Sequence, residues 1–237
     1  TRDGLVATTR YVVGGQERVN VYLPDGRQVL GQVVRSFPAM DLALIQTNVQ
    51  ITQLLRVTQM QVLPDQMVIY AMTHPGQQGQ VTESVKRTTR HQTAPHWFPT
   101  MINRLIDAGG NPIYDQQNTL VGLLTKNTSR TSGYAYGLHI LKIYEAIQQF
   151  YQEKQQSVGQ TLYCFSCGIM SRAVAYNGFY CENCGSTLSY AVEMTRYPQM
   201  NLVGLYGENA HRPCPNCGSQ VGYYQGYCMR CGYEEEK

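Results

Sequence analysis

Eight cysteines in the last third of the chain form the clearest chemical pattern in the sequence. They fall into four Cys-x2-Cys pairs, and in every pair a glycine follows the second cysteine (CFSCG, CENCG, CPNCG and CMRCG). Such a glycine lets the backbone fold back so that its amides point at the sulfur atoms. Four thiolates from two such turns form the tetrahedron that structural zinc takes at ~2.3 Å. We therefore predict two zinc ions, one held by Cys164, Cys167, Cys181 and Cys184, the other by Cys214, Cys217, Cys228 and Cys231.

Disulfide bonds of a secreted module and redox-active cysteine pairs are the other uses of this spacing. Four regular units without thioredoxin-like surroundings favour zinc, and the pattern resembles a pair of zinc ribbons, although a crossed pairing of the four turns also fits. Each ribbon is too small to bury a core of its own, so metal binding would supply much of its folding energy. Thiolate zinc sites favour a reducing compartment. We therefore expect a location in the cytoplasm or on the cytoplasmic side of a membrane complex.

The residues before the cysteines predict a mainly β domain. Between residues 4 and 140, short segments of alternating apolar residues are separated by Gly, Pro, Asp and Asn, as in a β-sandwich or β-barrel. The apolar residues change to helical spacing between residues 140 and 154, so we expect one amphipathic helix to close the domain. No apolar run approaches the ~20 residues that a membrane-spanning helix needs.

Several motifs in this domain resemble the trypsin-like serine proteases of the HtrA type over nearly all of residues 1–154. The segment GLVATTRYVV is similar to the strand that carries the family's histidine. DLALI, which begins at Asp41, is similar to the family's aspartate motif, and DAGGNPIYD at residues 107–115 is similar to its nucleophile loop. The resemblance implies a trypsin-like double β-barrel with a C-terminal helix at residues 1–156. A first zinc ribbon would follow at 157–190, and a linker with a second ribbon at 191–237.

The same resemblance implies that one strand of the domain lies outside this sequence. The family begins with a strand some twenty or more residues before its histidine strand, whereas this sequence starts inside that hairpin. We therefore expect either a missing N-terminal strand or a second polypeptide that completes the barrel. A membrane anchor would fit within such a preceding segment.

The positions of the catalytic triad are degenerate when the chain is placed on this family pattern. Arg10 stands at the histidine position and Gly109 at the nucleophile position, and only Asp41 is kept. Asp107 stands where the family has an oxyanion-hole glycine. Because arginine stays protonated and glycine has no side chain, we predict no catalytic residues and an inactive protease homologue. Arg10 is expected either to pair with Asp41 or to point to solvent while Asp41 caps a backbone amide.

These features predict a non-catalytic interaction or structural subunit of a larger assembly. Its partners would be other subunits, or an extended peptide that adds to the strand at residues 133–140. Contact with a membrane is expected only through an unseen N-terminal segment or a partner. Nucleic-acid binding through the ribbons is the alternative, but residues 157–237 contain five Lys and Arg against six Asp and Glu. That balance makes nucleic acid an unlikely partner.

Overall fold

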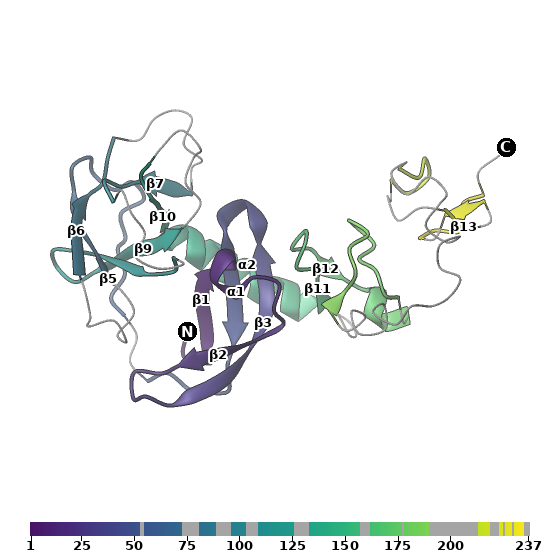
Figure 1. Ribbon diagram of the computed structural model, residues 1–237, viewed down its shortest axis with the longest axis horizontal. Helices are drawn as coiled ribbons and strands as arrows, with labels where there is room; N and C mark the ends of the chain where they lie inside the picture. Colours follow the sequence, from purple (N-terminus) through teal and green to yellow (C-terminus); the bar gives the residue numbers. More distant parts are fainter. Residues whose placement is uncertain are drawn as a thin grey trace. The chain divides into compact units, whose positions relative to one another are not determined.

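A computed structural model gives the fold of the chain (Figure 1). It describes residues 1–52, 55–72, 81–88, 96–102, 109–125, 133–156, 162–176, 178–189, 213–218, 223–224, 226–228 and 230–234. The chain divides into two units, Thr1–Gln155 and Gln156–Lys237. In the described part of the chain, no helix has the length and apolar character needed to cross a membrane.

The first sheet is antiparallel and curled, with four strands in the order β1-β4-β3-β2; it is called the first barrel below, and the six-stranded sheet the second. Its strands are β1 (Leu5–Thr9), β2 (Arg18–Tyr22), β3 (Gln28–Phe37) and β4 (Leu42–Gln46). β4 lies between β1 and β3, and the run from Leu42 to Ile45 is buried throughout, which explains why this strand is continuously apolar. Two short helices frame the sheet, α1 (Arg10–Val13) directly after β1 and the 3-10 turn η1 (Pro38–Met40) directly before Asp41.

The second sheet has six strands in the order β6-β5-β8-β9-β10-β7 and closes on itself. Its strands are β5 (Val68–Met72), β6 (Val81–Val85), β7 (Trp97–Pro99), β8 (Pro112–Asp115), β9 (Leu120–Thr125) and β10 (Tyr136–His139). The two edges meet where the Arg87 amide donates to the Pro99 carbonyl at 2.9 Å and the Met101 amide to the Val85 carbonyl at 3.0 Å. The barrel encloses the core residues Leu63, Ile69, Ala71, Phe98, Ile102, Ile113, Val121, Leu124 and Ala135.

One expectation about this barrel is wrong. The strand at residues 133–140 was expected to offer a free edge to a peptide, but β10 is paired on both sides, with β9 and with β7. The β7 partner was not foreseen because it lies about forty residues earlier in the sequence, beyond the reach of local patterns.

The helix α2 (Ile140–Gln156) follows β10 directly. The imidazole of His139 precedes its first turn, and His139 Nδ1 accepts a hydrogen bond from the Leu141 amide at 3.2 Å, as a helix-capping side chain does. Ile140, Ile143, Ala146 and Phe150 form its buried stripe, as the helical spacing predicted. The mainly β class with a C-terminal helix is thus confirmed.

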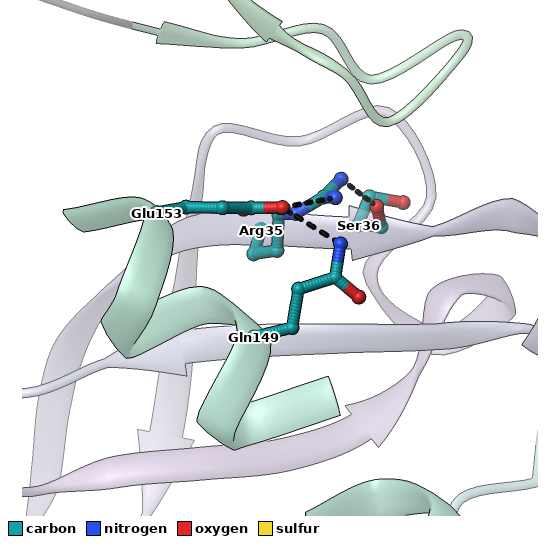
Figure 2. A network of polar contacts seen from close by, with 4 residues as sticks. All are labelled: Arg35, Ser36, Gln149 and Glu153. Carbon is teal, nitrogen blue, oxygen red and sulfur yellow. Dashed lines mark hydrogen bonds and ion pairs between the residues drawn. The ribbon is translucent and has the colours of Figure 1, made fainter. Parts of the chain in front are cut away.

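A polar network joins the end of α2 to the first sheet (Figure 2). The Arg35 guanidinium, from β3, donates from Nε and Nη2 to the two carboxylate oxygens of Glu153 at 3.0 and 3.1 Å. It also donates to the Ser36 carbonyl at 2.8 Å and lies over the Phe37 ring at 4.3 Å. Gln149, one turn before Glu153, donates to the same carboxylate at 2.7 Å. The helix α2 is therefore fixed to the first sheet by a largely buried ion pair between Arg35 and Glu153.

The second unit contains short two-stranded sheets around the cysteine turns. In the described residues these are β11 (Leu162–Tyr163) with β12 (Met170–Ser171) and β13 (Tyr223–Tyr224) with β14 (Tyr227–Cys228), and a 3-10 turn η3 (Ala173–Tyr176) follows β12. Around the sheet of β11 and β12, the buried side chains of Ala173 and Leu188 lie beside Cys164 and Cys181. The core of this unit is therefore built on the cysteine groups themselves.

Candidate active site and metal centres

Asp41 lies at the end of η1 in a left-handed backbone conformation, with φ 53° and ψ 36°. Few residues other than glycine adopt this conformation, although aspartate tolerates it better than most. Its amide donates to the Pro38 carbonyl at 3.2 Å, and its carbonyl accepts from the Arg10 amide at 2.8 Å. The end of β1 and the start of β4 are therefore fixed to each other at this residue.

The carboxylate of Asp41 is buried and accepts two hydrogen bonds. The Tyr11 amide donates to Oδ1 at 3.0 Å, and the Thr125 hydroxyl, at the end of β9, donates to Oδ2 at 2.7 Å. Asp41 belongs to the first barrel and Thr125 to the second, so the carboxylate joins the two. Sequence reasoning foresaw a backbone amide as one partner of Asp41 but missed Thr125. The only signal was a threonine that ends an otherwise apolar strand, LVGLLT.

The structure also brings the predicted nucleophile loop to this place. Gly109 and Gly110 have φ values of 91° and 82°, and the Gly110 amide donates to the Leu124 carbonyl at 2.7 Å, next to Thr125. A methyl group added at Gly110 would lie 2.9 Å from the hydroxyl of Thr8 in β1. Only glycine fits so close an approach at this φ. We call Arg10, Asp41, Gly109 and Thr125, with the backbone around them, the barrel junction.

Arg10 begins α1 and is half-buried. Its position is set by Thr9, whose hydroxyl accepts a hydrogen bond from the Val12 amide at 3.4 Å and so caps the turn. The contact of Arg10 with Asp41 described above joins backbone atoms, and an ion pair between their side chains stays a prediction. A protonated guanidinium cannot accept a proton, and Gly109 has no side chain, so peptide cleavage at the barrel junction would need a base and a nucleophile from other residues. Asp107 lies outside the described residues.

Two side chains of the second barrel hold the turn before Asp41. His96 Nε2–H donates to the Ala39 carbonyl at 3.0 Å, and the Trp97 indole N–H donates to the Met40 carbonyl at 3.5 Å. The two rings meet edge to face at 4.8 Å. Burial lowers the pKa of His96, and the Ala39 carbonyl opposes this only in part. The neutral ring still carries the proton that this hydrogen bond requires.

The family model described as the trypsin-like peptidase domain matches residues 1–123, just over half of the chain. The chain belongs to this family. Among solved structures, "HtrA-type protease AlgW with decapeptide" has the same trypsin-like fold, with a TM-score of 0.53 at 22% identity over 64% of this chain and 50% of that one. This chain therefore matches about half the length of that protease. A search of curated proteins gave no match.

Membership of the trypsin-like peptidase family corrects one prediction. The sequence predicted that the chain is not an enzyme, because of Arg10 and Gly109. The match to a trypsin-like peptidase domain contradicts this prediction, and nothing in the described residues shows inactivity. The prediction rested on two positions of a family pattern, and two substitutions cannot show which groups a folded domain uses.

The unit after the trypsin-like domain contains four turns of one geometry. In each, the glycine after the second cysteine has a left-handed backbone and its amide donates to the carbonyl of the first cysteine. The bonds are Gly168 to Cys164 at 2.7 Å, Gly185 to Cys181 at 2.8 Å, Gly218 to Cys214 at 2.7 Å and Gly232 to Cys228 at 2.8 Å, with φ values of 74°, 75°, 69° and 71°. A β-carbon would strain this conformation, which explains the repeated Cys-x2-Cys-Gly motif.

The sulfur atoms of these turns gather in two groups of four, the same sets that the spacing predicted. Cys164 and Cys184 Sγ are 3.6 Å apart and Cys167 and Cys181 Sγ 3.7 Å; in the other group, Cys214–Cys231 and Cys217–Cys228 are both 3.8 Å. A tetrahedral ion with metal–sulfur bonds of ~2.3 Å has sulfur–sulfur edges of ~3.8 Å. Both groups therefore fit a tetrahedral metal ion, with no crossing between ribbons.

Hydrogen bonding prepares one of these sulfurs for the ligand form. Burial alone would raise the pKa of Cys184, but hydrogen bonds with Ser186 and with the neighbouring sulfurs of Cys164 and Cys167 outweigh burial and lower its pKa to about 6. Burial raises the pKa of Cys181 in the same group. The group thus combines an easily deprotonated thiol with one that a metal ion must deprotonate.

Proposed function

We propose that the chain is a protein-binding subunit of a larger assembly. Its trypsin-like domain would take an extended segment of another protein at the barrel junction, and its cysteine-rich unit would bind zinc and dock on partner subunits. The observation that supports this most strongly is the intact barrel junction, where Asp41 joins the two barrels through the Tyr11 amide and the Thr125 hydroxyl. Binding an extended segment is a step that proteolysis and non-covalent recognition share, so the proposal is compatible with the family.

The structural neighbour supports a peptide as the ligand, because it is described with a decapeptide. In this chain β10 has no free edge, and we place the bound segment at the barrel junction instead. Tyr11 and Val12 lie there on α1 with 52% and 47% of their surface exposed. Val12 Cγ2 lies 3.7 Å from the position of a β-carbon at Gly110. They would supply apolar contact area to a bound segment.

Zinc is the metal that the two cysteine groups would hold. Each group offers four sulfur ligands in a tetrahedron, with no position left open for water or substrate, which is the arrangement of structural zinc. When bound, zinc would neutralise the thiolates and cross-link the two turns of each ribbon. None of the eight cysteines forms a disulfide in the structure, and we propose a reducing compartment, in the cytoplasm or on the cytoplasmic side of a membrane complex.

Exposed aromatic and aliphatic side chains favour protein over nucleic acid as the partner of the ribbons. Ile169 and Tyr227 are each 47% exposed, Phe179 40% and Tyr233 37%. Such residues are common at the centres of protein interfaces, whereas nucleic-acid surfaces are strongly basic. The excess of acids over bases after residue 156 agrees with this choice.

A binding assay with matched variants tests the role of the barrel junction. Labelled unfolded casein is titrated with the metal-loaded chain and with Tyr11→Glu, and cleavage is followed in the same samples. Tyr22→Glu is the control, because Tyr22 is 62% exposed on β2, away from the junction. We expect Tyr11→Glu to weaken binding about tenfold or more, as for a central interface residue, and Tyr22→Glu to bind like the wild type. Equal binding by all three proteins would refute peptide binding at the junction.

Size-exclusion chromatography of native lysate tests the assembly. The chain is followed with and without nuclease, at low and moderate salt. Persistence in a large complex under all conditions supports the subunit role. A shift to the monomer position on nuclease treatment would contradict it and favour nucleic-acid binding.

A further inference from the structure

The two cysteine groups differ in how far protein covers their ligands. In the group of Cys164, Cys167, Cys181 and Cys184, two cysteines are buried and two half-buried. In the group of Cys214, Cys217, Cys228 and Cys231, two are buried, one is half-buried and Cys231 is exposed. A metal ion in the second group therefore has one ligand open to solvent, and an incoming ligand can approach from that side.

The two groups also differ in what joins their turns apart from the metal. In the first, the carboxylate of Glu182, inside the turn 181–184, accepts hydrogen bonds from the buried Ser171 hydroxyl and from the Arg172 amide at 2.8 Å. Those donors follow the turn 164–167, so hydrogen bonds join the two turns in addition to the ion that they would share.

The corresponding links in the second group lie at the surface. Asn216, inside the turn 214–217, donates from Nδ2 to Cys231 Sγ of the opposite turn at 3.5 Å, and Arg230 donates to the Cys217 carbonyl at 3.3 Å. Asn216 and Arg230 are exposed. The exposed sulfur is therefore oriented by the backbone amide of Tyr233 and by one side-chain amide, that of Asn216, which water can replace.

From these differences we infer that the two metal sites release their ions in a fixed order. The site of Cys214, Cys217, Cys228 and Cys231 is the exchangeable one, and Cys231 is the first ligand to leave. Asn216 is a positioning residue that keeps the Cys231 sulfur on the metal. In the exchange, a donor atom of a competing chelator would take the place of the Cys231 thiolate, which would leave the ion and take up a proton from water. The inference rests on the proposed binding of zinc to both groups.

The chain offers a matched pair of residues for the test. Asn216 and Asn183 occupy the same position in their turns, Cys-Pro-Asn-Cys and Cys-Glu-Asn-Cys. Both are exposed. The backbone amides of both bond to the first sulfur of their own turns, but within the described residues only the side chain of Asn216 bonds to a cysteine sulfur. Replacing each by alanine therefore removes the same side chain, but only one substitution removes a contact with a ligand.

The experiment follows metal release from the full zinc-loaded chain. Elemental analysis first counts the ions; a colorimetric chelator then takes them up, while timed alkylation and mass mapping show which cysteines become free. We expect two phases, with the cysteines of the 214–231 site alkylated first. Asn216→Ala should speed the first phase about tenfold, the usual effect of losing a contact to a metal ligand, and Asn183→Ala should leave both phases unchanged.

Other outcomes would contradict the order of release, the role of Asn216 or zinc binding itself. Release in one phase, or earlier alkylation of the 164–184 site, would overturn the inferred order while leaving zinc binding intact. Equal acceleration by both alanine variants would overturn the role of Asn216. Fewer than two ions in the purified chain would overturn the proposed zinc function together with this inference.

Discussion

Replacing Glu153 by alanine should destabilise the trypsin-like domain more than any other charge removal on α2. Glu153 lies near the C-terminal end of the helix, where the helix dipole disfavours a negative charge. Its position is explained by Arg35, whose side chain is only 9% exposed and whose guanidinium contacts both carboxylate oxygens. In the variant the guanidinium keeps the Ser36 carbonyl and the Phe37 ring but loses its only counter-ion shown in Figure 2.

The size of the loss follows from the burial of the two partners. Removing one partner of a fully buried ion pair costs ~3–5 kcal/mol, because the other charge stays buried. Glu153 is 22% exposed at its side chain, so water reaches the pair in part and a loss of about 2–3 kcal/mol is expected. For a unit of this size, that corresponds to a fall in Tm of roughly 5–10 °C.

The same helix provides the control for this substitution. Glu145 pairs with Lys142 at 2.7 Å, with side chains 60% and 37% exposed. An exposed pair contributes ~0–1 kcal/mol, so Glu145→Ala should change stability little. Urea unfolding of residues 1–237 with zinc bound, followed by Trp97 fluorescence, compares the two variants. Equally small losses of unfolding free energy for Glu153→Ala and Glu145→Ala would refute the reasoning, because the expected difference rests on the burial of the two ion pairs.

Four further predictions concern other parts of the chain. Thr125→Val should cost about 1–3 kcal/mol by leaving a buried oxygen of Asp41 without its donor, and an unchanged urea midpoint would contradict this. Gly110→Ala should lower stability by at least ~1 kcal/mol, because its β-carbon meets Thr8 at 2.9 Å in a left-handed backbone, and normal thermal unfolding would refute that. Burial lowers the pKa of His139. Its contribution to stability is therefore present above the usual histidine pKa of about 6.5 and lost as pH falls through the lowered value, so His139→Asn should flatten the decline of stability below that pH. Removing metal should expose the second unit to proteolysis while Thr1–Gln155 stays intact, and equal resistance with and without chelator would contradict a structural metal.

The cysteine groups were predictable because their chemistry is local. Each turn spans five residues, and its glycine, its left-handed φ and its amide-to-carbonyl bond all lie within those five. The short spacing within each set then decided which two turns meet. What the sequence could not show was the unequal exposure of the two groups, because the cover over Cys231 depends on residues outside the turns.

The barrels were predictable only as a set of strands. Alternating apolar residues predicted most strands, helical spacing predicted the closing helix, and the order of the motifs predicted the family. The pairing of β10 with β7 and the bond from Thr125 to Asp41 join residues far apart in the sequence, the latter 84 positions apart. Contacts at that separation leave no periodic signal, so the expected groove beside β10 was wrong and the partner of Asp41 was missed.

The geometry of Asp41 explains why an aspartate is needed here whatever the chemistry of the site. Its carboxylate accepts hydrogen bonds from the Tyr11 amide and from the buried Thr125 hydroxyl. A neutral apolar residue at position 41 would remove both of these hydrogen bonds, and each loss at a buried group costs ~1–3 kcal/mol. The residue therefore joins the two barrels at the place where a bound segment would lie. A variant of Asp41 would lose this link between the barrels, so a loss of peptide binding could not be told from a loss of the fold. The binding test therefore uses the exposed Tyr11 instead.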